Sequence, residues 1–179
     1  MNIFYLDNDP MTCAQMHNDK HCVKMILEYA QLLSTAHRVI DGVLTVGRSE
    51  AGRKQTRYVL SGGRDAVLYS STHVNHPSAI WVRQSVHNYN WLYDMWVHLM
   101  AEYTYRYGKI HATARLTDAL RDAPRNIPIG VFTEPTPAMP DDVKIPGNSI
   151  ASYQKYYINN KAHLANWKKR PVPSWFLTI

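Results

Sequence analysis

Residues 9–42 read DPMTCAQMHNDKHCVKMILEYAQLLSTAHRVIDG, and this stretch decides the fold. Asp9 followed by Pro10 indicates a helix start, because an Asp side chain caps the first amides and proline at the first helical position loses no hydrogen bond. Apolar residues then recur at helical spacing around most of the circumference. The stretch therefore predicts one long helix that runs to about Ile40, stops near Gly42 and packs on most sides.

The same predicted helix carries one narrow polar strip. At 100° per residue these side chains fall in line: His17, His21, Lys24, Glu28, Gln31, Thr35 and Arg38. Two His one turn apart, followed by Lys and Glu, are the residue types of acid–base and phosphate chemistry. We predict catalytic roles for His17, His21, Lys24 and Glu28, and substrate binding by Gln31 and Arg38. The alternative is a solvent-facing strip with ion pairs along the helix.

Composition and cysteine usage set outer bounds. The chain has 179 residues, 45% of them hydrophobic and 19% charged, which fits one globular domain over residues 1–179. No apolar run approaches the roughly 18 residues of a membrane span, and the first residues do not resemble a signal peptide. Cys13 and Cys22 stand too far apart on one helix to bridge. We expect reduced thiols, a cytoplasmic location and no membrane partner, and the oligomeric state stays open.

Further helices follow from the same periodicity and from capping residues. A second long helix is predicted from about Ser78 to Tyr107, with Gly108 as its terminating residue. A shorter helix is predicted over 110–121, and a third long helix begins after the cap Asn148 and ends before Pro171.

The remaining segments are extended or irregular. Residues 2–6 predict a short strand or an extended arm, and residues 57–60 with 66–69 predict a small hairpin. Residues 122–146 contain six prolines and predict a long ordered loop or lid, and the C-terminal tail is expected to dock Trp175 and Phe176. The fold class is thus mainly α: a single domain of three long helices plus short helices, with a small β-hairpin or an extended N-terminal strand.

Some polar residues fall on apolar helix faces. Ser85, Asn88 and Arg106 lie within or beside the apolar arc of the second helix, and Lys161 aligns with the apolar side of the third. Polar groups on a buried face need partners. We predict that these four residues bind substrate, with structural hydrogen bonding, and an exposed amine for Lys161, as the alternative.

Basic residues suggest a phosphate-rich partner. The net charge is +6 with a pI near 9.3, and residues 38–64 hold six basic and two acidic side chains. Such a cluster can neutralise phosphates. We predict that Arg57 binds substrate and that DNA is the partner, although basic loops also serve solubility.

Metal and cofactor signals are weak. Cys13, His17 and His21 have metal-ligand spacing on one helix, but the sequence has no HExxH, CxxC, P-loop or GxGxxG motif. We predict no metal and no cofactor, and a metal-dependent hydrolase remains an alternative.

Most of the chain resembles a family of small uncharacterised phage proteins, through NIFYLDNDP, HNDKHCVKMILEYAQLLSTAHR, NHPSAIWVRQS, EYTYRYGK and WKKRPVPSWF. It also resembles the phage pyrimidine-dimer DNA glycosylases, all-α enzymes that flip a nucleotide and attack C1′ with an amine. That likeness rests on His17, on Arg106-Tyr107-Gly108 and on the tail from Arg170 to Trp175.

The glycosylase resemblance implies particular site residues. Members of that family use the α-amine of a Thr exposed by removal of Met1, and an acid seven residues after the helix His. Here Asn2 is bulky enough to keep Met1, and the seventh residue after His17 is Lys24, with Glu28 one turn later. Under this resemblance Lys24 is a substitute amine with Glu28 as its acid–base partner.

These observations predict a DNA-acting enzyme that works on bases or nucleotides, by glycosylase-like base excision or by phage DNA base modification. The alternatives are a non-catalytic DNA-binding or host-interaction phage protein and the metal-dependent hydrolase.

Overall fold

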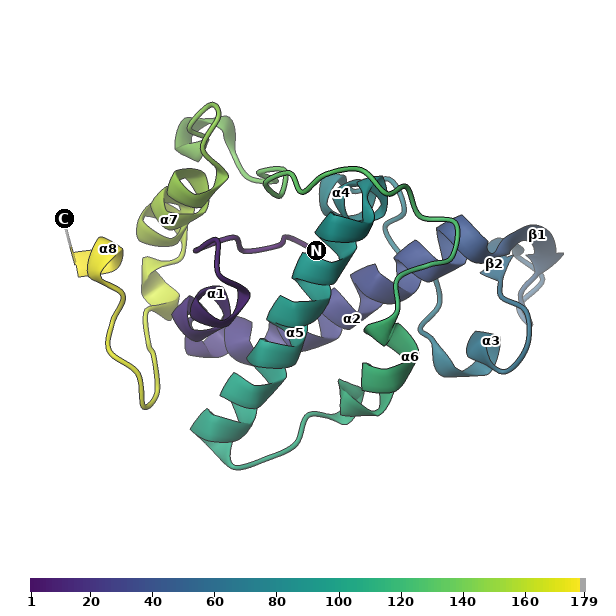
Figure 1. The fold of residues 1–179 in the computed structure, drawn as a ribbon, viewed down its shortest axis with the longest axis horizontal. Coiled ribbons are helices and arrows are strands. Elements are labelled where there is room, and N and C mark those ends of the chain that lie inside the picture. Colours follow the sequence, from purple (N-terminus) through teal and green to yellow (C-terminus); the bar gives the residue numbers. More distant parts are fainter. Residues whose placement is uncertain (178–179) are drawn as a thin grey trace.

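Two long helices, α2 and α5, cross near the centre of the protein in a computed structural model that describes residues 1–177 (Figure 1). The helices are α1 (Pro10–Met16), α2 (Asp19–Asp41), α3 (Arg64–Val67), α4 (Pro77–Gln84), α5 (Val86–Tyr107), α6 (Thr117–Arg121), α7 (Ser149–Asn160) and α8 (Ser174–Leu177). Short 3₁₀ helices are η1 (Ala112–Leu116), η2 (Asp141–Val143) and η3 (Ala162–Leu164), and the strands are β1 (Val43–Arg48) and β2 (Lys54–Val59). The predicted mainly α fold is confirmed.

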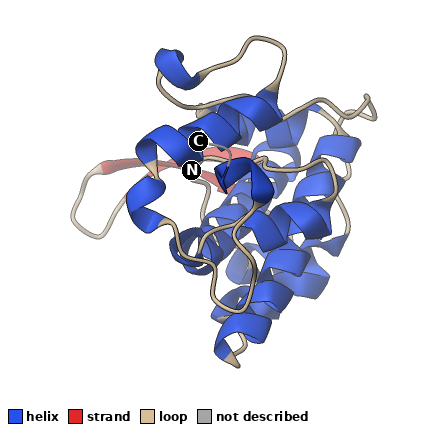
Figure 2. Cartoon of the chain, turned by 90° about the vertical axis from the view of Figure 1, so that its left-hand side faces the viewer, coloured by secondary structure: helices blue, strands red, loops and turns tan. Residues whose placement is uncertain are grey.

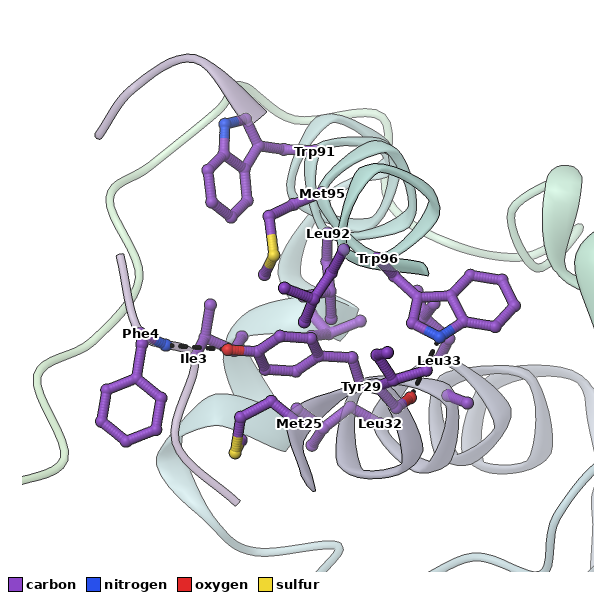
Figure 3. Close-up of a cluster of buried hydrophobic side chains, with 14 of the residues drawn as sticks. Ile3, Phe4, Met25, Tyr29, Leu32, Leu33, Trp91, Leu92, Met95 and Trp96 are labelled. Carbon is purple, nitrogen blue, oxygen red and sulfur yellow. Dashed lines mark hydrogen bonds between the residues drawn. The ribbon is translucent and has the colours of Figure 1, made fainter. Parts of the chain in front are cut away.

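The core lies where α2 packs against α5 (Figure 3). Tyr29, Leu32 and Leu33 of α2 and Leu92 and Trp96 of α5 have no exposed surface. The Trp96 indole N–H donates to the Ile26 carbonyl at 3.0 Å, so this polar group is satisfied inside the core. One continuous buried cluster runs from the N-terminal arm to the C-terminal segment.

The first predicted helix is in fact two helices. α1 ends at Met16, His17 and Asn18 are extended, and α2 starts at Asp19. The Asn18 side chain accepts the His21 amide hydrogen, which makes Asn18 an N-cap in the middle of the predicted helix. The prediction that the side chains from His17 to Arg38 form a single strip on one helix is therefore wrong, because His17 lies before α2 begins. The predicted helix end is confirmed, since Gly42 ends α2.

A similar cap divides the second predicted helix. Ser85 is extended, and its hydroxyl accepts the Asn88 amide hydrogen at 3.1 Å, which separates α4 from α5. Gly108 closes α5 in the left-handed conformation as predicted, with φ of 66°. The third helix begins after the Asn148 cap, but α7 ends at Asn160, well before Pro171, because η3 and a turn follow.

The hairpin lies earlier in the chain than predicted. β1 pairs antiparallel with β2, from Val43 opposite Val59 to Arg48 opposite Lys54, and residues 64–67 form α3 (Figure 2). The β-branched run at the start of β1 was the stronger strand signal. The two strands stand at the edge of the helical body, at the far end of α2 from α7 and α8 (Figure 1).

The N-terminal residues form an extended arm. Within residues 1–177 they join no strand, yet Ile3, Phe4, Tyr5 and Leu6 are buried. A side chain provides a hydrogen-bond partner for the backbone of the arm, because the Tyr29 hydroxyl accepts the Phe4 amide hydrogen. Because the arm is buried, it places the first residue at a defined position.

The proline-rich loop and the tail pack onto the helices as predicted. The Trp81 indole donates to the Thr133 carbonyl at 3.0 Å, and the Thr133 amide donates to Asn88. Trp175 and Phe176 pack against the core. No helix within residues 1–177 is both long enough and apolar enough to span a bilayer.

Candidate active site

The buried arm brings the chain start onto α2. The Phe4 ring stacks on His21, with centroids 4.0 Å apart, and the Phe4 amide donates to the Tyr29 hydroxyl at 3.2 Å. The Cys13 thiol contacts the same arm, 3.2 Å from the Phe4 carbonyl and 3.3 Å from the Leu6 amide. The packing of the arm against the core therefore fixes the position of residue 1.

An amine–carboxylate cluster forms at this point. The α-amine of Met1 lies 3.0 Å from Oε2 of Glu28, and Nζ of Lys24 lies 3.3 Å from Oε1 of the same carboxylate. The Glu28 side chain is 15% exposed, whereas that of Lys24 is 72% exposed. One largely buried carboxylate thus faces two primary amines, one held by the arm and one free to move in solvent.

One histidine, His76, lies in the electrostatic field of this cluster, and His73 lies in turn near His76. Burial lowers the pKa of His76, the Met1 amine and His73 lower it further, and Glu28 opposes them. Nδ1 of His76 accepts the Ser78 amide hydrogen, so a proton on the neutral ring is carried by Nε2. His73 has φ of 48°, a left-handed conformation that non-glycine residues adopt rarely and that is common at functional sites.

The two histidines predicted as catalytic lie inside the protein instead. His17 has no exposed surface; its Nδ1 donates to the Cys13 carbonyl and its Nε2 accepts from the Tyr29 hydroxyl, both at 2.8 Å. Nδ1 of His21 bonds the Tyr157 hydroxyl at 2.6 Å. Burial lowers the pKa of His17 to about 4 and that of His21 to about 3. Both rings are neutral at pH 7 and hold the arm in place.

Arg106 is the centre of a buried ionic cluster. Its fully buried guanidinium bonds Glu102 at 2.7 Å, Asp19 at 2.9 Å and the His17 carbonyl at 2.9 Å. Glu102 also pairs with Arg170 at 2.9 Å. These contacts join α5 to the α1–α2 junction and to the C-terminal segment, so Arg106 acts as a structural tie.

Arg38 plays a comparable part at the other end of α2. Its side chain is 4% exposed and pairs with Asp65 at 2.6 Å. It also donates to the carbonyls of Tyr58, Leu68 and Tyr69. Arg38 thereby fixes the base of the hairpin and α3 to α2, about 15 Å along the helix axis from Glu28.

The remaining predicted binding residues do not converge. Ser85 caps α5 and donates to the Val131 carbonyl, and Asn88 bonds Trp81 and Thr133, so both tie α4 and α5 to the proline-rich loop. Arg57 is exposed on β2. Lys161 follows α7 with its amine 5.0 Å from the centre of the Tyr156 ring. Gln31 is half-buried on α2 near Glu28, so of the predicted residues Lys24, Glu28 and Gln31 are neighbours.

A groove of about 620 Å³ opens beside Lys24. The residues that line it are Asp19, Lys20, Val23, Lys24, Tyr107, His163, Leu164, Ala165 and Asn166. On its α2 wall Lys20 and Lys24 outnumber the single acid Asp19, which is paired with Arg106, and Tyr107 supplies a ring. The groove is thus suited to an anionic ligand with a flat apolar part.

The structure adds residues that sequence reasoning missed. The Met1 amine belongs to the cluster, and His76 is coupled to it electrostatically. The sequence signal that could have revealed the role of Met1 was the hydrophobic arm that follows it. No three His, Cys, Asp or Glu side chains form a metal-ligand group within residues 1–177. Burial also raises the pKa of the Cys13 thiol to about 12, which opposes the thiolate form that binds metals.

No family model, curated protein or solved structure matches this chain.

Proposed function

We propose that this chain is a DNA-acting enzyme that excises bases through an amine, with the Met1–Glu28–Lys24 cluster as its active centre. The observation that carries the proposal is the α-amine of Met1, held 3.0 Å from a Glu28 carboxylate that is 15% exposed. A positioned amine next to a carboxylate is the arrangement needed for covalent catalysis at a sugar carbon.

The proposed reaction uses both partners of this pair. Glu28 removes a proton from the ammonium, and the amine nitrogen attacks C1′ of the nucleotide. The C1′–N bond to the base breaks, and the base leaves with one of the amine's protons. The sugar ring then opens as its oxygen takes the second proton, which leaves an imine between C1′ and the amine. Glu28 is placed to carry these protons, and water later hydrolyses the imine.

The spacing of a histidine and an acid on α2 supports this proposal. His21, not His17, is the histidine within α2, and Glu28 lies seven residues after it. This spacing equals the one between the helix His and the acid in the pyrimidine-dimer glycosylases. Asn2 is expected to retain Met1, which would make the amine that of Met1 instead of a second-residue Thr.

Charge favours a nucleic-acid substrate. The chain carries a net charge of +6, and Lys20 and Lys24 line the groove that begins at the cluster. A DNA strand in this groove would place its phosphates against the lysines and a sugar near the two amines.

The test is reductive trapping. The protein is incubated with duplex DNA that carries an abasic site or a pyrimidine dimer, borohydride is added, and the adduct is mapped by peptide mass spectrometry. We expect an adduct at Met1, or at Lys24 if the exposed amine attacks, and loss of base release in Glu28→Gln. The control Asp118→Asn removes an exposed acid of α6, outside the cluster and the groove, and should behave as wild type. Adducts scattered over surface lysines, or none at all, would contradict the proposal.

A further inference from the structure

The β1–β2 ribbon contributes little to the core. All residues of β1 are exposed, with Val43, Leu44 and Val46 at 69%, 54% and 64%, and β2 is exposed except at Tyr58. Isolated two-stranded hairpins are marginally stable in water, so this one depends on its attachment. Arg38 supplies that attachment through its bond to the Tyr58 carbonyl at 2.8 Å.

The ribbon is strongly basic. Residues 43–59 contain four basic residues, Arg48, Arg53, Lys54 and Arg57, and one acid, Glu50, so the net charge of this segment is +3. Arg48 and Lys54 are directly opposite each other in the pairing register. Such a concentration of like charge costs stability by repulsion and is complementary to a polyanion.

One face of the ribbon has side chains suited to reading base edges. Thr45 pairs with Arg57 and Gly47 pairs with Gln55, so Thr45, Arg57 and Gln55 project from the same face. Arg and Gln form bidentate hydrogen bonds with guanine and adenine in the major groove. The opposite face carries Leu44 and Val46 and, at the tip end of the ribbon, the pair Arg48 and Lys54.

A hollow lies on this polar part of the ribbon. It has a volume of about 490 Å³ and is lined by Arg48, Gln55, Arg57 and the tip residues 49–51. Gly47 pairs with Gln55, and no atom lies within 4 Å of the position that a Cβ at Gly47 would occupy. The face that carries Gln55 and Arg57 is therefore open beside Gln55, and a larger residue at position 47 would project from that face.

We propose that the β1–β2 ribbon enters the major groove of duplex DNA with Gln55 and Arg57 toward the base edges. Arg53 in the tip loop, and Arg48 and Lys54 at the tip end of the other face, then extend their long side chains to the phosphates that flank the groove. The inference rests on the proposed function, since it names how that enzyme holds its substrate. The major groove, about 12 Å wide, admits a two-stranded ribbon.

The position of the ribbon sets where its contacts fall. α2 connects Glu28 to Gly42 directly (Figure 1), and fourteen residues at about 1.5 Å each span about 21 Å. That length corresponds to about six base pairs at roughly 3.4 Å each. Groove contacts by the ribbon should thus begin about six base pairs from the nucleotide that faces Glu28, on one side only.

The first experiment measures binding of the full chain to undamaged duplex DNA across a salt series. In Arg53→Ala/Lys54→Ala, two lost phosphate contacts should lower the slope of log K against log salt by about 1.8. The affinity at 0.1 M salt should fall at least tenfold. Lys109→Ala/Arg121→Ala removes two exposed charges outside the ribbon and should leave both quantities unchanged. An unchanged slope in the ribbon variant would overturn the inference.

The second experiment identifies the groove. The DNA is a duplex that carries a stable abasic-site analogue, and it is treated with dimethyl sulfate with and without the protein. Dimethyl sulfate methylates guanine N7 in the major groove and adenine N3 in the minor groove. We expect N7 protection about six base pairs or more from the analogue, lost in Arg57→Ala and in Gly47→Val. Protection confined to adenine N3, or N7 protection that survives both substitutions, would overturn the inference.

The two proposals fail in distinguishable ways. Normal trapping at Met1 or Lys24 with ribbon variants that bind like wild type would overturn the ribbon inference alone. Ribbon-dependent DNA binding without any adduct or base release would support the ribbon and overturn the proposed enzyme. If the wild-type chain binds no DNA even at low salt, both are overturned. Urea midpoints equal to wild type check that each ribbon variant folds.

Discussion

Phe4 stacks on His21, with ring centroids 4.0 Å apart and only 17° between the ring planes. This contact joins the N-terminal arm to the first turn of α2. Glu28 lies two turns further along α2, and the Met1 amine reaches its carboxylate. The stacked pair therefore links the core of the protein to the geometry of the candidate active centre.

Phe4→Ala should weaken both the fold and the site. Phe4 is 5% exposed, and truncation of a buried Phe costs about 3–5 kcal/mol of unfolding free energy. The measurement is urea unfolding, paired with base release at a temperature where the variant stays folded. Phe132→Ala is the matched control, because Phe132 is 38% exposed and should cost clearly less. Equal losses for the two variants would show that the arm is not anchored through Phe4.

Three buried histidines should make the protein unstable in mild acid. Burial lowers the pKa of His17 and His37 to about 4 and that of His21 to about 3, from an ordinary value of 6.5. Below pH 6.5 the unfolded chain binds protons that the folded chain excludes, so stability falls as the pH drops toward 4. The loss between pH 6.5 and 5 is on the order of 1–2 kcal/mol per histidine.

The structure explains why these rings resist protonation. Nδ1 of His37 faces Arg64, which can only donate, so Nε2 is the N–H that meets the Tyr89 hydroxyl. Urea midpoints at several pH values test the prediction. His37→Gln should flatten the pH dependence by about a third, since one of three groups is removed. A midpoint that does not change between pH 7 and 5 would contradict it.

The fold class and several boundaries were predictable because local signals determine them. Gly42, Gly108 and the Asn148 cap each end or begin a helix where the sequence indicates. The internal caps were missed because apolar periodicity continues across Asn18 and Ser85, although each residue accepts an amide hydrogen three residues later. A hydrogen bond to a capping side chain can thus divide a helix even where the apolar residues continue at helical spacing.

The candidate site was only partly predictable for a different reason. Lys24 and Glu28 are one turn apart on one helix, so their pairing follows from the sequence. Met1 is 27 positions from Glu28, and no spacing rule connects them. Only the packing of the arm brings the amine there. Polar residues on buried helix faces, such as Arg106 and Asn88, bond residues in distant segments of the chain. A helical wheel shows one helix alone and cannot predict such partners.

Arg106→Met should strongly destabilise the protein. Its removal leaves Glu102, which is 3% exposed, without its closest charge partner, and loss of one member of a buried pair costs about 3–5 kcal/mol. Arg106→Met/Glu102→Leu should recover part of this loss, as read from urea midpoints in a double-mutant cycle. Arg121→Met breaks a surface pair with Asp118 and should cost under about 1 kcal/mol. A small loss for Arg106→Met would refute its role as a tie.

Blocking the Met1 amine should separate catalysis from binding. A Gly-Ser extension before Met1 converts the α-amine into an amide, which is not nucleophilic and no longer pairs with Glu28 as a charge. If Met1 is the attacking group, base release should fall at least a hundredfold, because covalent catalysis is lost while the groove and the ribbon remain intact. DNA affinity should change by less than about threefold. Lys24→Ala provides the comparison, since its amine faces the same carboxylate at 3.3 Å. If Lys24→Ala abolishes the borohydride adduct and the extension does not, the nucleophile is Lys24, and the arm serves to position Glu28 instead.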